Sequence, residues 1–432
     1  MMALCFHTAL CAIDVKHPVH PPWWPPGSEA SAESVGIVSR NRVYMTAMMA
    51  YNATAAASAA EDTQDVADIA AAAGTNMSGL VSCLVNTRRG ATAHVRRLFE
   101  NLLGEAGPAL TVVEMMGEYD GAFGFTIGCV AVLPALMPTR VVATTTGSGR
   151  AIVDRGNISH FSVRAATAND ALTEVATLAE AAVTDDVAGK DGGFGGAGAA
   201  GAAGAGATGN SVTNGLERLI ECTAFVRAGT LGEADAKAVV KALDATRVPP
   251  ALTVVHAPTD VPGEASSVFT TYAYDGGHSE AHGVAIACTA LAGHAPEHRK
   301  RRVKVGSAGS AVVADGLVHA SALLTHDVNA SSAFDELATL LKSAGSSLDL
   351  AIRCRFFLQA PPPTGYPAAL FASFQRTFCE AHPPPPTRAE YVAAVPASVI
   401  APTTSTPIMV SHTLNPPSAV LMQCTAALPV DS

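Results

Sequence analysis

Apolar and small residues follow a strand–strand–helix–strand order in Gly306–Leu358. The letters AVVADGLVHASALL predict a β-hairpin, because two apolar runs flank the turn pair Asp315-Gly316. Apolar residues then recur at helical spacing in FDELATLL, and Gly345 stands just past this predicted helix, where a left-handed residue is favoured. LAIRCRFFL is typical of a buried strand. The segment therefore predicts one compact unit of strands and helices.

The same order of elements occurs twice more upstream, so the chain is an internal repeat. PALTVV appears letter for letter at Pro108–Val113 and Pro250–Val255, and the predicted closing strands read IGCVAVLP, IACTALAG and MQCTAALP. We expect three α+β domains over residues 31–135, 138–293 and 299–429. Each is predicted to be a mixed sheet of about six strands with two helices on one face.

Four stretches interrupt this pattern. Residues 1–30 contain PVHPPWWPPG and are expected to form an extended or disordered lead. A Gly/Ala-rich insert at 185–213 and a Pro/Thr/Ser-rich insert at 397–418 are predicted loops within the second and third repeats. HRKRR at 298–302 is interpreted as a solvated linker.

Composition narrows the class of protein. Apolar residues make up 49% of the 432, which is enough for real cores. The net charge of −10 argues against nucleic acid as a partner, because phosphate binding needs clustered Lys and Arg. No apolar run reaches the roughly 18 residues of a membrane span. The first residues lack the basic region of a signal peptide, so we expect a cytoplasmic protein with no membrane partner.

Six of the nine cysteines occupy equivalent places, two in each repeat. They are Cys83, Cys129, Cys222, Cys288, Cys354 and Cys424. Each lies in an apolar strand pattern, and we interpret them as small buried hydrophobic residues. Disulfides are disfavoured if the compartment is cytosolic. No spacing typical of a zinc site occurs, so no metal and no cofactor is expected.

Three segments carry a resemblance to a known family. Gly306–Ser321 resembles, without gaps, the segment GPYSQAVKAGNLVFVS of the Rid family, the reactive-intermediate deaminases formerly called YjgF or L-PSP endoribonuclease proteins. Gly147–Ser162 aligns to the same hairpin, and SSLDLAIRCRFFL is similar to the family's SLDDVVKVTVFL strand. The resemblance implies a chorismate-mutase-like fold. Because Rid proteins are homotrimers with pockets between subunits, it also implies that three linked copies form a monomeric pseudo-trimer.

The resemblance further implies an Arg that holds the substrate carboxylate and a Tyr, a Ser and a Glu that position substrate and water. The Arg position holds Ala109, Ala251 or, with a slip of one residue from Thr387, Arg388. The hairpin Ser position holds Ser34, Arg150 and Gly309, and the Tyr position holds Glu33, Gly149 and Ala308. The Glu position holds Thr126, Ala285 and Leu421, and the Gly after the second-strand Ser is replaced by Ala47, Val163 and Ala322.

No repeat holds the full set, and Arg388 with Ser34 is the candidate composite pocket. We therefore expect a non-catalytic scaffold or a module that binds a small carboxylate-bearing ligand. Two alternatives stay open. One is an enamine or imine deaminase that converts 2-iminopropanoate to pyruvate and ammonia. The other is an accessory role in diphthamide synthesis, because eukaryotic diphthine–ammonia ligases resemble an ATP pyrophosphatase domain followed by Rid-like domains. The sequence does not identify a protein partner.

Overall fold

A computed structural model describes most of each predicted repeat. The described residues are 16–23, 35–45, 55–87, 92–104, 107–114, 125–144, 149–183, 214–227, 230–257, 283–292, 299–305, 309–324, 330–359, 390–392, 409–410 and 420–429. Ser34, Arg388 and the Gly/Ala insert lie outside them. Within these ranges, no helix is long and apolar enough to cross a membrane.

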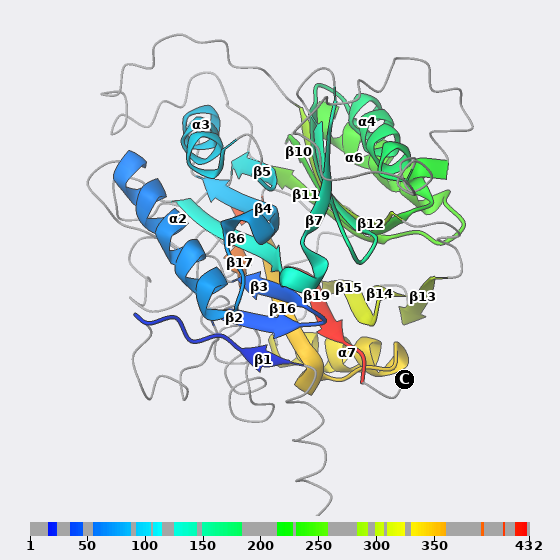
Figure 1. The fold of residues 1–432 in the computed structure, drawn as a ribbon. Helices are drawn as coiled ribbons and strands as arrows, with labels where there is room; N and C mark the ends of the chain where they lie inside the picture. Colours follow the sequence, from blue (N-terminus) through cyan, green and yellow to red (C-terminus); the bar gives the residue numbers. More distant parts are fainter. Residues whose placement is uncertain are drawn as a thin grey trace, which may run out of the picture.

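The chain folds into three separate sheets, one for each predicted repeat (Figure 1). The first has the order β1-β2-β3-β6-β4-β5: β1 His17–Pro18, β2 Gly36–Ser39, β3 Arg42–Met45, β4 Leu80–Thr87, β5 Ala109–Glu114 and β6 Phe125–Val132. The second has the order β11-β10-β12-β9-β8-β7: β7 Pro138–Ala143, β8 Gly149–Asp154, β9 Ile158–Ala165, β10 Leu219–Arg227, β11 Ala251–Ala257 and β12 Val284–Leu291. The third has the order β13-β14-β15-β19-β16-β17: β13 Lys300–Val305, β14 Gly309–Ala314, β15 Leu317–Leu324, β16 Ala351–Gln359, β17 Glu390–Val392 and β19 Val420–Ala427.

The three sheets share one topology. In each, antiparallel strands are joined to an equivalent parallel pair, namely β4–β5, β10–β11 and β16–β17. A further short strand, β18 (Met409–Val410), falls in the predicted Pro/Thr/Ser insert and pairs with β16. The predicted α+β class and the threefold recurrence of the mixed sheet are confirmed.

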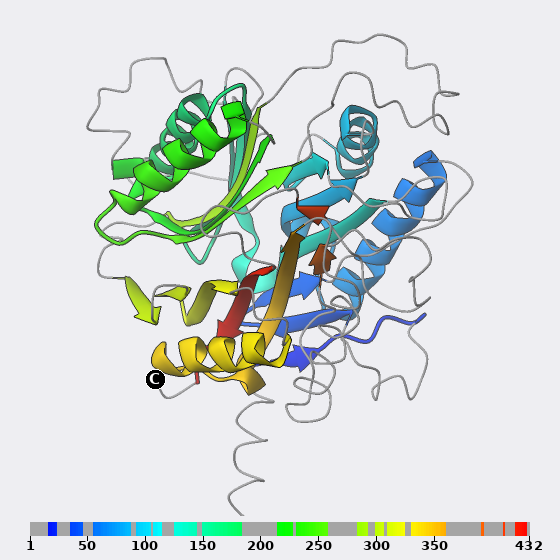
Figure 2. The same ribbon diagram turned by 180° about the vertical axis from the view of Figure 1, so that it is seen from behind.

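The helices among the described residues cover the outer face of each sheet. Figures 1 and 2 show them around the periphery, with the three sheets turned toward one another at the centre. The long helices are α2 (Ala55–Ala72), α3 (Thr92–Leu103), α4 (Ala168–Ala181), α6 (Thr230–Asp244) and α7 (Ala330–Ser343). In the first two repeats they pack on the sheet through separate apolar cores of Val, Ile, Leu, Phe and Ala side chains.

The hairpin turns follow the residues that the sequence offers. Arg40 and Asn41 both have positive φ, as do Asp315 and Gly316 in the third repeat. Two-residue turns of this hand match the twist of the flanking strands, and Asn, Asp and Gly adopt them most readily. The predicted turn pair Asp315-Gly316 is confirmed.

Equivalent hydrogen bonds join the first repeat to the second and the second to the third. Thr111 on β5 donates its hydroxyl to Ser162 on β9, with 2.8 Å between the two oxygens, and Ser162 donates to the Leu110 carbonyl at 2.7 Å. Thr253 and Ser321 repeat this contact at 3.0 Å, with Ser321 donating to the Leu252 carbonyl. The same interface is therefore used twice.

A second pair of equivalent contacts closes the ring. Lys300 donates its ammonium to the Leu219 carbonyl, at the start of β10, at 3.0 Å. Lys16 makes the same contact with Ala351, at the start of β16, also at 3.0 Å. Lys16 belongs to the first sheet and Ala351 to the third, so the three repeats contact one another cyclically as an intramolecular pseudo-trimer. Burial lowers the pKa of each lysine to about 8. A nearby carboxylate, Asp349 for Lys16 and Glu217 for Lys300, partly offsets this shift.

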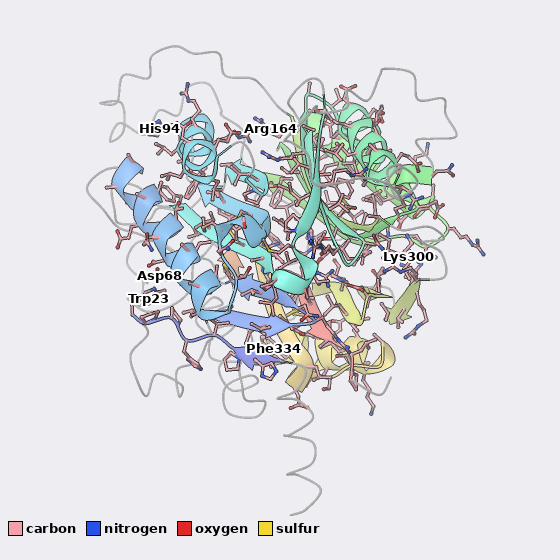
Figure 3. All side chains as sticks on the ribbon, viewed as in Figure 1. Trp23, Asp68, His94, Arg164, Lys300 and Phe334 are labelled. Carbon is pink, nitrogen blue, oxygen red and sulfur yellow. A yellow bond between two sulfur atoms is a disulfide. The ribbon has the colours of Figure 1, made fainter. Side chains whose placement is uncertain are left out.

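Two expectations about the connecting segments need correction. The lead is not disordered throughout, because His17–Pro18 pairs with β2 and Lys16 is fully buried. HRKRR is not simply a solvated linker, because Lys300 is buried and begins the edge strand β13 (Figure 3 labels it). Both segments supply the edge strand before a hairpin, and β7 does so in the second repeat.

The six equivalent cysteines are buried, as predicted, but the expectation that disulfides are disfavoured needs correction. They form three disulfides, Cys83–Cys129, Cys222–Cys288 and Cys354–Cys424. Each joins directly opposite residues of two adjacent antiparallel strands, with Cα atoms 4.1–4.2 Å apart. The shared register of the three closing strands explains why the pairing recurs.

We predict that these six cysteines resist alkylation in the unfolded, non-reduced chain. Peptide mapping by mass spectrometry should find the three pairs linked, and reduction before alkylation should label all six. Disulfides persist in oxidising compartments, so native chain isolated with six alkylated thiols would contradict the pairing and favour a reducing compartment instead.

We also predict that the chain is a monomer in solution. Among the described residues, the inner sheet faces are already covered within one chain, so these faces are not left to drive trimer formation. Light scattering should give a mass near 43.9 kDa, that of one chain. A mass near three chains would show that these faces are covered between molecules.

Candidate functional site

The three hairpins meet at a buried ion cluster. Arg42 on β3 donates to Asp154 at the end of β8 at 2.9 Å and to Asp315 in the third hairpin turn at 2.7 Å. Arg42 and Asp154 are almost completely buried, whereas Asp315 is partly exposed. One guanidinium therefore bridges all three repeats.

A cavity of about 90 Å³ lies beside this cluster, on the pseudo-threefold axis. Each sheet contributes an equivalent row of side chains across three paired strands. These rows are Tyr44–Val130–Ser82, His160–Thr289–Glu221 and His319–Thr425–Arg353. We call this space the axial cavity. Its walls combine side chains from all three repeats.

Polar contacts cross the axial cavity between unlike residues. His319 Nδ1 lies 2.9 Å from Glu221 Oε2, and Thr223 exchanges hydrogen bonds with the Gln423 amide at 3.0–3.2 Å. Burial lowers the pKa of His160 to about 3, helped by Arg42 and His319, so this imidazole stays neutral. The second and third repeats thus supply most of the polar wall.

A second pocket lies at the interface between the first and second repeats. Its volume is about 110 Å³, and we call it the interface pocket. One wall is formed by Pro108, which directly precedes β5, by Leu110 on β5 and by the end of α3. Arg150 on β8 and Ser162 and Arg164 on β9 form the other wall. Figure 3 shows Arg164 on the side of the second sheet that faces α3 and β5.

The two arginines give the interface pocket a positive wall. Arg150 and Ser162 are directly paired across β8 and β9, and Arg164 lies two residues further along β9. Both guanidinium-bearing side chains are half-buried. Glu100 on α3 also lines the pocket; burial raises its pKa, and Arg150 opposes that shift. The arrangement suits a small anion, with one carboxyl group at its rim.

Two positions that the resemblance singles out line the interface pocket, but with other residues. Gly149 stands at the Tyr position and Arg150 at the hairpin Ser position. Ala109, at the Arg position on β5, is buried outside the pocket, between Pro108 and Leu110, which line it. Arg388 and Ser34, the composite candidates, lie outside the described residues, so their pairing stays a prediction.

Sequence reasoning missed Arg164 altogether and treated Arg150 only as a lost serine. A usable signal was present, since two arginines fourteen residues apart on adjacent strands of one hairpin lie near each other. Among the described residues, no group of three or more His, Cys, Asp or Glu side chains is placed to hold a metal ion.

Comparison with known proteins gives matches to solved structures alone. No family model and no curated protein matches the chain. It is similar to a protein from Entamoeba histolytica described as an endoribonuclease L-PSP, at 16% identity over 27% of this chain and 99% of that one, with a TM-score of 0.25. It is also similar to yeast Mmf1, at 18% identity over 28% and 99% of the two chains and a TM-score of 0.25.

A third similar structure is a YjgF/YER057c/UK114 family protein from Mycobacterium tuberculosis, at 13% identity over 27% and 99% of the two chains and a TM-score of 0.25. Identities this low concern the fold alone. The predicted tandem α+β organisation is confirmed by the three mixed sheets in one chain. None of these matches bears on diphthine–ammonia ligases, so that relation stays a prediction.

We predict that Arg42→Met destabilises the chain by about 3–5 kcal/mol, because it leaves the Asp154 carboxylate buried without its charged partner. Urea unfolding should report the loss. Asp315→Asn is the matched control; because Asp315 is partly exposed, we expect a clearly smaller effect. Equal stability of Arg42→Met and the native chain would show that the cluster does not hold the repeats together.

Proposed function

We propose that the chain is a non-catalytic, Rid-like pseudo-trimer that binds a small carboxylate-bearing ligand in the interface pocket. The observation that carries this proposal is the placement of Arg150 and Arg164 in one pocket between two repeats. Guanidinium groups pair with carboxylates through two parallel hydrogen bonds, which gives orientation as well as affinity.

The loss of catalysis rests on what surrounds the two arginines. The Tyr position is Gly149, which has no side chain to orient a substrate. The family's last-strand Glu is replaced by Thr126 in the first repeat and Ala285 in the second. Thr126 is buried and accepts a hydrogen bond from Asn86, so it has a structural role. These residues supply binding groups but not the family's set for water activation.

One observation supports the alternative of residual deaminase activity. Glu100 brings a carboxyl group of raised pKa to the rim of the interface pocket, where it faces Arg150. A carboxyl group with a pKa nearer neutrality is suited to proton transfer. Ammonia release from freshly generated 2-iminopropanoate decides between the two functions. A brisk rate that Glu100→Gln abolishes favours the enzyme over the binding module.

We predict that Arg150→Gln and Arg164→Gln each weaken binding of a small carboxylate by about tenfold or more, because each removes a charge-assisted hydrogen bond. Pyruvate and L-serine are suitable probes, the latter because the similar Escherichia coli TdcF structure is described with bound serine. Isothermal titration calorimetry on the full chain gives the dissociation constants.

Arg155→Gln is the matched control, since Arg155 lies exposed in the turn between β8 and β9, outside the pocket. It should bind as the native chain does. Unchanged affinity in both pocket variants would remove the interface pocket as the carboxylate site and leave Arg388 with Ser34 as the candidate.

A further inference from the structure

We propose that Asp62 is a proton-dependent switch in the first repeat: α2 packs tightly on its sheet only while the Asp62 carboxyl group carries a proton. The proposal does not rest on the function proposed for the interface pocket, because Asp62 does not line that pocket. It starts from three observations: the burial of Asp62, the lack of hydrogen bonds to its carboxyl group and the acidic groups beside it.

Asp62 lies on the apolar face of α2. Ala59 and Val66, three residues before it and four residues after it, are fully buried and belong to the apolar core of the first repeat. Asp62 itself has an exposed fraction of 0%. Residues at this spacing share one face of a helix, so the Asp62 side chain is packed in the protein rather than turned to solvent.

The Asp62 carboxyl group is buried without compensation. Among the described residues, neither of its oxygens has a hydrogen-bond partner. Burial of a polar group without a hydrogen bond costs free energy, and burial of an ionised carboxylate costs far more than burial of the neutral acid. Burial, together with the neighbouring carboxylates of Asp65 and Glu61 on the same helix, raises the pKa of Asp62 to about 8. At neutral pH the group is therefore kept mainly in its neutral form.

The described elements around α2 do not supply a cation that offsets this shift. α2 packs against α3, β3, β6 and the short helix η2 (Met77–Gly79). β6 and η2 carry no ionisable side chain, β3 carries Arg42 and Tyr44, and α3 carries His94, Arg96, Arg97 and Glu100. Arg42 belongs to the buried ion cluster, and Arg96 donates to the Val112 carbonyl at 3.4 Å. None of these groups contributes to the shift in the pKa of Asp62.

The other repeats show what packing alone requires at this position. On α4, Ala171 stands four residues before Val175, as Asp62 stands four residues before Val66 on α2. Ala171 is fully buried in the apolar core of the second repeat. The equivalent residue of α7 in the sequence is Ala333. A small apolar residue serves at this position, so the carboxyl group in the first repeat is not needed for packing.

Linkage gives the direction of the pH effect. When α2 moves away from the sheet, Asp62 enters water and its pKa returns to about 3.9. Between about pH 4 and about pH 8, the packed state therefore holds one proton that the loosened state releases to solvent. The equilibrium shifts toward the loosened state by about tenfold for each pH unit of increase in this window.

The experiment is native-state hydrogen exchange of the full chain at several pH values from about 5 to 8, read by mass spectrometry and corrected for the intrinsic exchange rate. The variants are Asp62→Ala, which introduces the residue of the other repeats, and Asp62→Asn, which keeps the shape of the side chain. Asp68→Asn is the matched control, because the Asp68 carboxylate lies on α2 but accepts an exposed hydrogen bond from Gln64 at 2.8 Å. The amides of α4 are the internal reference.

We expect protection of the α2 amides to fall by about tenfold per pH unit in the native chain and in Asp68→Asn, relative to both Asp62 variants. Protection of the α4 amides should be equal in all four chains. The same pH dependence in the native chain and in the Asp62 variants overturns the proposal. So does a parallel fall in α4, which assigns the effect to the whole fold rather than to α2.

If neither Asp62 variant folds, the native chain decides the question. Nuclear magnetic resonance of chain labelled with ¹³C at the aspartate Cγ atoms gives the pKa of the carboxyl group that titrates last. A pKa about two units or more above the ordinary value of about 3.9 upholds the proposal, and a smaller shift overturns it.

Discussion

The inner faces of the three sheets have to cover one another, and the rest of the structure depends on this constraint. Helices protect only the outer faces. The inner faces carry apolar side chains such as Ile37, Ile152 and Ile352, one from each repeat, which pack in a single buried cluster. A repeat on its own would expose this face to water as a large apolar patch. Folding one repeat therefore requires the other two beside it.

Linking the repeats in one chain allows unlike residues to meet on the axis. In a symmetric trimer every axial position faces two copies of itself, so a buried charge there repels its copies. In this chain Arg42 faces Asp154 and Asp315, and His319 faces Glu221. Linkage in one chain also allows the interfaces between repeats to differ from one another. Arg150 and Arg164, for example, line the interface pocket between the first and second repeats. Asymmetry thus gives the fold both its cohesion and its candidate sites.

The sequence predicted the parts of this fold that local pattern determines. The Asp315-Gly316 turn, the apolar strands and the amphipathic helices all have local signals. The edge strands β1 and β13 were missed because they are short or basic and lack alternation. The disulfides depend on strand register, which brings opposite cysteines together from distant positions. The interface pocket was missed because β5 and Arg164 belong to different repeats, and only their packing makes them neighbours.

Engineered cross-links test most directly whether successive repeats pack on one another through the same interface. Thr111 with Ser162 and Thr253 with Ser321 occupy equivalent contacts at successive interfaces, with side-chain oxygens 2.8 and 3.0 Å apart. Paired cysteine substitutions at both contacts, mapped by mass spectrometry after oxidation, should form both cross-links within one chain and leave the mass of a monomer. Failure of the second contact to cross-link, or cross-links that join separate chains, would contradict successive repeats of one polypeptide packing through the same interface.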